Sequence, residues 1–133
     1  MTPEQIATAF VTAINSRAID TMAELMTENH IFIDSDGTRV PGRERMREGW
    51  ISYFEMVPDY CIEVHETFTR DQTVVLLGIA TGTFADAGVL KLENSWSVPA
   101  AWRALVEDQK VAVWQVYVNP EPMRKILDRI GGA

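Results

Sequence analysis

Residues 60–84 read YCIEVHETFTRDQTVVLLGIATGTF, and this stretch decides the fold class. Over residues 60–68 apolar and polar side chains alternate, which is the period of a strand with one face in a core and one in water. Asp71-Gln72 predicts a turn, after which a second strand continues to Phe84. Gly78 and Gly82 predict bends or bulges in this second strand, so we expect a strongly curved antiparallel hairpin.

The rest of the sequence adds strands and helices on both sides of this hairpin. Alternation predicts further strands over 30–34, 92–106 and 111–118. Pro99 cannot donate a hydrogen bond to a neighbouring strand, so we expect an edge or a bulge there. Apolar residues at helical spacing predict helices over about 2–15, 18–27, 43–57 and 123–130. The order predicts an α+β fold in which helices pack on one face of a curved antiparallel sheet.

Composition and charge restrict the possible functions. The 133 residues suit a single domain, residues 1–133, and 47% of them are hydrophobic, as in a globular protein. With 12 Lys+Arg and 19 Asp+Glu the net charge is −7, which argues against binding nucleic acid or anionic membranes. The single cysteine and two histidines predict no metal site. No apolar run is long enough to cross a membrane, and the first residues do not resemble a signal peptide, so we expect a cytoplasmic protein.

Four short stretches are typical of one superfamily: Ala13-Ile14-Asn15-Ser16, His30-Ile31-Phe32-Ile33-Asp34, Pro41-Gly42-Arg43-Glu44 and Lys110–Val118. Together with the element order, they make the sequence resemble the nuclear-transport-factor-2-like superfamily, which includes the SnoaL-like cyclases and the ketosteroid isomerases. The resemblance implies a cone-shaped sheet wrapped around three helices and a mostly apolar pocket, and a homodimer formed through the outer sheet face. The superfamily contains isomerases, cyclases, epoxide hydrolases, dehydratases and non-catalytic binders, so the fold alone does not name a reaction.

Asp34 is the first candidate for catalysis. It falls where ketosteroid isomerases hold the aspartate that transfers a proton, and it shares a strand face with Phe32. An apolar pocket would favour its protonated form and suit it to proton transfer. In the alternative interpretation, Asp34 only caps the turn at Ser35-Asp36-Gly37. The oxyanion donors of the isomerases align with Phe10 and Ala101, which cannot donate from their side chains, so steroid isomerisation is not expected.

His30 and Arg103 are further candidates. His30 lies on the same expected strand face as Asp34 and could act as a second acid–base group. Arg103 lies among small and apolar residues, and if it faces the pocket it needs a carboxylate partner such as Asp34. Alternatively, Pro99 shifts the register and Arg103 lies at the dimer face or in solvent.

Aromatic and apolar side chains from several elements are expected to line the pocket. The residues that we assign to the pocket wall are Phe10, Met26, Phe32, Trp50, Tyr53, Trp96, Trp114 and Val116. Trp96 also fits a pocket mouth or a dimer interface, as does Trp102. Any one of these residues could instead be ordinary core packing.

The sequence therefore favours a small-molecule-binding, SnoaL-like protein whose ligand is compact and mostly apolar or aromatic. If the protein is an enzyme, Asp34 would carry out acid–base chemistry without a cofactor, in an isomerisation, cyclisation, dehydration or hydrolysis. The alternative is a non-catalytic ligand-binding domain or a dimerising interaction domain. A cavity beside Asp34 would favour the first reading, and a fully packed cone the second.

Overall fold

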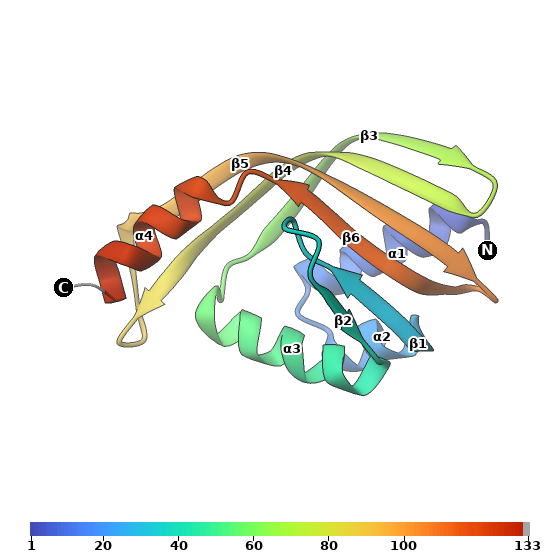
Figure 1. Ribbon diagram of the computed structural model, residues 1–133, viewed down its shortest axis with the longest axis horizontal. Coiled ribbons are helices and arrows are strands. Elements are labelled where there is room, and N and C mark those ends of the chain that lie inside the picture. Colours follow the sequence, from blue (N-terminus) through green and yellow to red (C-terminus); the bar gives the residue numbers. More distant parts are fainter. Residues whose placement is uncertain (132–133) are drawn as a thin grey trace.

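A curved six-stranded sheet arches over helices in the computed structural model, which describes residues 1–131 (Figure 1). The helices are α1 (Pro3–Asn15), α2 (Ile19–Glu24), α3 (Arg43–Met56) and α4 (Glu121–Gly131). The strands are β1 (Met26–Ile33), β2 (Arg39–Pro41), β3 (Cys61–Arg70), β4 (Thr73–Asp86), β5 (Val89–Glu107) and β6 (Lys110–Val118). Their order in the sheet is β2-β1-β6-β5-β4-β3. The α+β class predicted from the sequence is confirmed.

The sheet combines sequential hairpins with one long-range pairing. The pairs β3–β4, β4–β5, β5–β6 and β1–β2 are antiparallel, as expected, whereas β1 and β6 run parallel. This parallel pair joins the first strand of the chain to the last, and it brings the carboxyl ends of both strands to the same edge of the sheet. Residues just after Ile33 and Val118 therefore lie at one end of the molecule.

Most expected elements are present, with shifted bounds. The capping box at the start of α1 is formed: Gln5 N–H donates to Thr2 Oγ1, and Thr2 N–H donates to Gln5 Oε1. α2 is shorter than expected, because β1 begins at Met26. Asp34 follows β1 instead of belonging to it. The three-residue strand β2 was not predicted, because it is too short to show an alternating pattern.

The glycines and the proline of the sheet mark its irregular points. The register of β3 shifts between Val64 and Glu66, opposite Gly78, where an added Cβ would lie only 1.8 Å from the carbonyl oxygen of Glu63. Pro99 lies one residue beyond the last pair between β5 and β6, Ala100 with Val118, so β5 has a neighbour only on its β4 side there. The edge expected at Pro99 is confirmed, whereas the bulge expected in β4 at Gly78 lies in β3, opposite this glycine.

The core fills the space between the concave sheet face and the helices. Phe10 and Ile14 of α1 are fully buried, as are Trp102 of β5 and Trp114 of β6. Among residues 1–131 no helix is long and apolar enough to cross a membrane.

Gly82 permits a close approach of β4 to the side chains of Val57 and Trp96. A Cβ at this position would lie 2.5 Å from Val57 Cγ1 and 2.7 Å from Trp96 Cζ2, both in buried residues. We expect Gly82→Ala to lower the free energy of unfolding by about 1–3 kcal/mol, because neither neighbour can move without disturbing the core. Chemical denaturation would measure this loss.

Gly49→Ala is the matched control for this substitution. Its Cβ would make ordinary contacts of 3.7–3.8 Å with Met46, and alanine is the better helix former, so stability should stay unchanged or rise. If Gly82→Ala were as stable as the wild type, the tight packing at Gly82 would be wrong.

Candidate functional site

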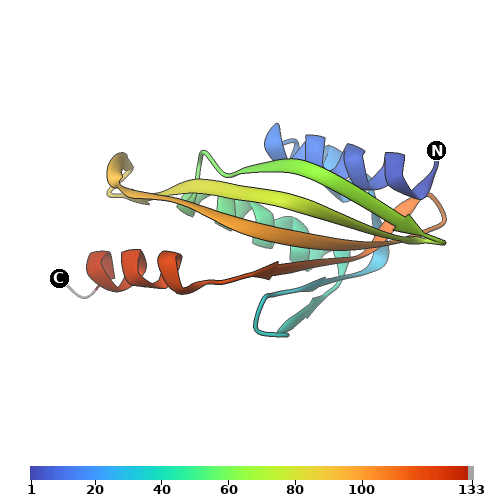
Figure 2. The same ribbon diagram turned by 90° about the horizontal axis from the view of Figure 1, so that it is seen from above.

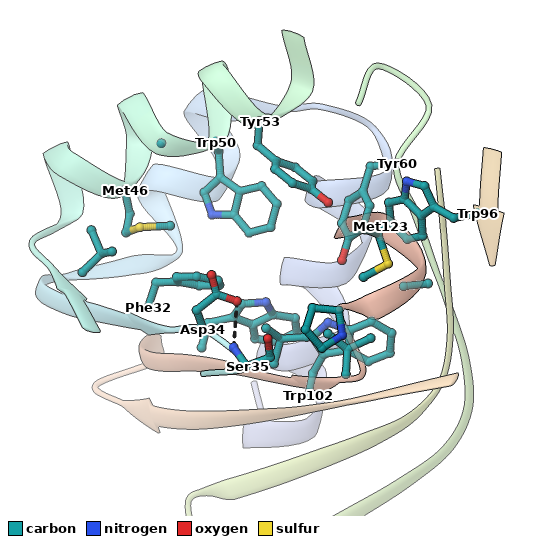
Figure 3. A pocket seen from close by; sticks show the side chains of 17 residues that line it. Phe32, Asp34, Ser35, Met46, Trp50, Tyr53, Tyr60, Trp96, Trp102 and Met123 are labelled. Atoms are coloured by element: carbon teal, nitrogen blue, oxygen red, sulfur yellow. Dashed lines mark hydrogen bonds between the residues drawn. The ribbon is translucent and has the colours of Figure 1, made fainter. Parts of the chain in front are cut away.

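A cavity of about 330 Å³ lies between α3 and the concave face of the sheet. This volume is within the range of roughly 300–1,000 Å³ that is usual for small-molecule sites. Its wall is mainly aromatic and includes the rings of Phe32, Trp50, Tyr53, Tyr60, Trp96 and Trp102. Figure 3 shows these rings around the open space, with Asp34 at one end and Trp96 at the other. Apart from tyrosine hydroxyls, the lining contains one ionisable side chain, that of Asp34.

Aromatic contacts fix the orientation of the rings on the helical side of the cavity. The Trp50 ring lies edge-on to Tyr53, with centroids 6.0 Å apart and an interplanar angle of 87°. Tyr53 is in turn edge-on to Tyr60, at 5.1 Å and 88°. Tyr60 also packs at 6.1 Å against Trp96. Such edge-to-face packing is the favoured geometry of aromatic pairs, so this side of the cavity is a rigid wall.

Asp34 both caps the turn and borders the cavity, two positions that the sequence left as alternatives. Its Oδ1 accepts a hydrogen bond of 2.7 Å from the backbone N–H of Ser35, drawn as the dashed line in Figure 3. Its backbone closes the same turn through bonds to Gly37 and Thr38. The side chain also borders the cavity, and within residues 1–131 its Oδ2 takes part in no hydrogen bond. However, Asp34 is exposed, so the expected shielding of its carboxylate from water is wrong.

Tyr60 is a cavity residue that the sequence did not identify, and polar contacts to the α1–α2 connection hold it in place. Arg17 Nη2 donates to the carbonyl oxygen of Tyr60 at 2.8 Å, and Arg17 Nε donates to that of Pro58 at 2.8 Å. The side-chain amide of Asn15 bonds both backbone groups of Ile62, two residues after Tyr60. It accepts from Ile62 N–H at 2.8 Å and donates to Ile62 O at 2.9 Å. The sequence signal for Tyr60 was its position on the apolar face of the expected strand, which does not separate a cavity from a packed core.

The hydroxyls of Tyr53 and Tyr60 are directed into the space between α3 and the sheet (Figure 3). Burial raises the pKa of Tyr53, and the nearby Asp34 charge raises it further. Burial also raises the pKa of Tyr60, with a smaller contribution from Tyr53, although a hydrogen bond from the Trp102 indole opposes the shift. Both hydroxyls therefore keep their protons and act as neutral hydrogen-bond donors.

The structure brings most of the expected pocket residues together, but not all of them. The expected residues that line the cavity are Phe32, Asp34, Trp50, Tyr53, Trp96, Trp114 and Val116. Phe10 and Met26 are not part of the wall, because both are fully buried in the core beneath it, where Phe10 packs at 5.0 Å on Trp114. Trp102, expected at a mouth or an interface, lines the cavity at 1% exposure.

His30 is a core residue and does not line the cavity. Its Nδ1 lies 2.7 Å from the carbonyl oxygen of Val111, so Nδ1 carries the proton and donates it. Nε2 then has a lone pair but no hydrogen-bond partner within residues 1–131. Burial lowers the pKa of His30, with the bond to Val111 opposing the shift in part. In the structure, His30 ties β1 to β6.

Arg103 lies on the outer face of the sheet. Its neighbours Trp102 and Ala104 are buried on the concave side, and side chains alternate along a strand. The Arg103 Nε donates to Gln115 Oε1 of the adjacent strand at 3.1 Å. Arg103 therefore has the position that the alternative interpretation gave it, away from the cavity and from Asp34. Ala101 shares this outer face, paired with Leu77 and Tyr117.

No group of three or more His, Cys, Asp and Glu side chains within residues 1–131 is arranged to hold a metal ion.

The arched sheet with helices in its concavity and a cavity between them defines a SnoaL-like, nuclear-transport-factor-2-like fold. The family model of the SnoaL-like domain matches residues 7–114, and the chain belongs to this family. Among curated proteins, none matches the sequence.

Solved structures agree on the fold at low sequence identity. A protein from Shewanella denitrificans OS-217, whose assignment as a SnoaL-like polyketide cyclase is provisional, has a TM-score of 0.82 at 14% identity, over 96% of this chain and 97% of that one. An LEH-like epoxide hydrolase from M. tuberculosis has a TM-score of 0.77 at 16% identity, over 97% and 91%. A hypothetical protein with a ketosteroid isomerase-like fold from Catenulispora acidiphila DSM 44928, in complex with trimethylamine, has a TM-score of 0.76 at 18% identity, over 98% and 95%.

The buried His30 predicts a loss of stability in mild acid. The unfolded chain takes up a proton at the ordinary pKa of 6.5, whereas the folded chain resists protonation until a lower pH. The free energy of unfolding should therefore fall as the pH drops from about 7 towards the lowered pKa. Denaturation curves at pH 7 and 5.5 would measure the change.

His30→Asn, which retains a side-chain N–H donor, should reduce this pH dependence relative to the wild type. His65→Asn is the control, because His65 is exposed beside Glu63, and it should leave the dependence nearly unchanged. An identical pH dependence in the wild type and His30→Asn would contradict the assignment.

Proposed function

We propose that the cavity binds a compact, mostly apolar or aromatic small molecule, and that Asp34 exchanges a proton with it in a reaction that needs no cofactor. The observation that carries this proposal is the carboxylate of Asp34, which within residues 1–131 is the one carboxylate that borders an otherwise mainly apolar and aromatic cavity. Aromatic walls position a flat ligand and exclude water, while the carboxylate supplies the acid–base group. Isomerisation, cyclisation, dehydration and hydrolysis all use such a step.

One further feature supports catalysis over simple binding, and another supports a ligand site over a packed interaction domain. The bond from Ser35 N–H occupies Oδ1 of Asp34 and fixes the plane of the carboxylate, so Oδ2 has a defined direction. The open cavity also argues against the alternative of a packed interaction domain, in which Trp50 and Trp114 would fill the space. A non-catalytic ligand-binding protein would use the same cavity but would not depend on the basicity of Asp34.

We expect the protein to accelerate the base-promoted opening of 5-nitrobenzisoxazole, a compact aromatic probe. In this reaction Asp34 takes the ring C–H proton, the electron pair of that bond forms a nitrile, and the N–O bond breaks to give a coloured phenolate. Asp34→Asn should lower the rate by ~100-fold or more, because it removes the base but keeps an oxygen that accepts from Ser35 N–H. Absorbance of the phenolate measures the rate.

Asp36→Asn is the matched control. Asp36 lies in the same turn and accepts from Thr38 N–H through Oδ1, as Asn would, but it does not line the cavity. The control should react like the wild type. If the wild type, Asp34→Asn and Asp36→Asn gave the same rate, Asp34 would not be the base.

The outer sheet face supports the proposal that two copies form a homodimer. Half-buried apolar side chains lie there on neighbouring strands, among them Val75, Leu77 and Leu105. Figure 2 looks onto β4 and β5 from this side, and no helix of residues 1–131 crosses them. A second copy would cover this apolar surface around Arg103 and Gln115. The cytoplasmic location expected from the sequence stays a prediction.

We expect light scattering at micromolar concentration to give twice the monomer mass for the wild type. Leu77→Arg should shift the mass to that of the monomer, since it places a charge in the centre of the proposed contact. Leu92→Arg is the control, because Leu92 is 90% exposed and does not belong to this face, and it should leave the dimer intact. A wild type of monomer mass would exclude the dimer.

A further inference from the structure

All four tryptophans of the chain border the same cavity. They come from α3, β5 and β6, and they are Trp50, Trp96, Trp102 and Trp114. Aliphatic side chains would also bury an apolar ligand. Aromatic rings differ from them in one respect, because the face of each ring carries partial negative charge. The composition of the wall therefore bears on the charge of the ligand as well as on its shape.

The rings nearest the open space stand at steep angles to one another. Phe32 and Tyr53 are half-buried, and Trp50, Tyr60 and Trp96 keep 6–7% of their surface exposed. The interplanar angle is 75° between Phe32 and Trp50, 87° between Trp50 and Tyr53, and 88° between Tyr53 and Tyr60. These rings form an enclosure and not a flat stack. Enclosures of aromatic rings bind substituted ammonium groups through cation–π contacts.

The one charge that borders the cavity within residues 1–131 is negative. No lysine, arginine or histidine of these residues lines the wall, whereas Asp34 does, at one end of the open space (Figure 3). Its charge acts across the cavity: after burial, it is the second cause of the raised pKa of Tyr53. A field that disfavours a phenolate at Tyr53 favours a cation in the same space.

A positively charged ligand matches this field better than a neutral or a negative one. The Asp34 carboxylate repels an anion. A neutral ligand beside Asp34 takes water away from the carboxylate and gives it no partner, which costs free energy. A cation replaces the lost water with an ion pair and also contacts the ring faces. The net charge of −7 further raises the local concentration of cations around the protein.

We propose that the ligand is an organic cation, an apolar or aromatic molecule with one substituted ammonium group, and that this group lies between the aromatic rings and the Asp34 carboxylate. The inference rests on the cavity being the ligand site of the proposed function, and it adds the charge of the ligand. It does not depend on whether Asp34 also transfers a proton.

Phenyltrimethylammonium and tert-butylbenzene test the inference, because they have the same shape and differ in the positively charged nitrogen that replaces one carbon. Their affinities for the full chain are measured by titration followed by protein NMR. The wild type should bind the cation about tenfold more tightly than the neutral probe, or better, since ring faces and a counter-ion both favour the charge.

Asp34→Asn should narrow this ratio by about tenfold, because it removes the counter-ion but keeps an oxygen that accepts from Ser35 N–H. Asp36→Asn is the matched control, since it removes the same charge from the same turn, and Asp36 does not line the cavity. The control should change the ratio less than about twofold, because water and salt screen a charge outside the cavity.

The contribution of the rings is measured separately by replacing every tryptophan with 5-fluorotryptophan. Fluorine makes the ring face less negative and leaves the ring nearly the same size. The affinity for phenyltrimethylammonium should fall about threefold relative to that for tert-butylbenzene, which serves as the internal control for an intact cavity. An unchanged ratio would assign the cation to Asp34 alone and overturn the role of the rings.

The remaining outcomes separate this inference from the proposed function. Equal affinities of the two probes for the wild type, or the same ratio in the wild type and Asp34→Asn, would overturn the inference, while the bound neutral probe still supported a ligand site. If neither probe bound, the ligand site and the inference would both fall. A preference for the cation in a wild type that did not open 5-nitrobenzisoxazole would support the inference and count against the acid–base reaction alone.

Discussion

The bonds of Asn15 and Arg17 to the segment before β3 are the interaction on which the cavity depends. They tie the end of α1 to the backbone of residues 58–62, where the chain passes from α3 into the sheet. The Arg17 guanidinium also lies 5.8 Å from the centroid of the Phe54 ring, so one side chain fixes α3 and β3 together. Without this link the segment around Tyr60 would lose its four hydrogen bonds to Asn15 and Arg17, and the aromatic wall would lose support on that side.

The cavity stays open because rigid aromatic rings surround it. A core made only of aliphatic side chains would close by rotamer changes, whereas large flat rings packed edge-to-face cannot. The same packing that stabilises the domain therefore preserves a space for a ligand. The residues that stabilise the fold here are also those that border the proposed ligand site.

The sequence predicted the helices and strands better than it predicted which strands pair in the sheet. The alternation around β3 and β4, the capping box at Thr2 and Gln5, and the glycine at the β3 bulge are local signals, and the structure contains all three. The parallel pairing of β1 with β6 joins residues about 80 positions apart, and no local pattern encodes it. Whether Arg103 faces the cavity or the outer side of the sheet depends on the strand register, which the sequence alone does not determine. The residues of the cavity wall were harder to predict, because an aromatic residue on an apolar face has the same sequence pattern whether it packs in the core or lines a cavity.

The last part of the cavity wall comes from the end of β6 and the start of α4. Val116, Val118, Pro120 and Met123 all border the cavity. Because β1 and β6 run parallel, the segment after β6 lies at the same end of the sheet as Asp34, which follows β1. Substitutions in residues 116–123 would therefore change the shape of the cavity without altering the turn that carries Asp34.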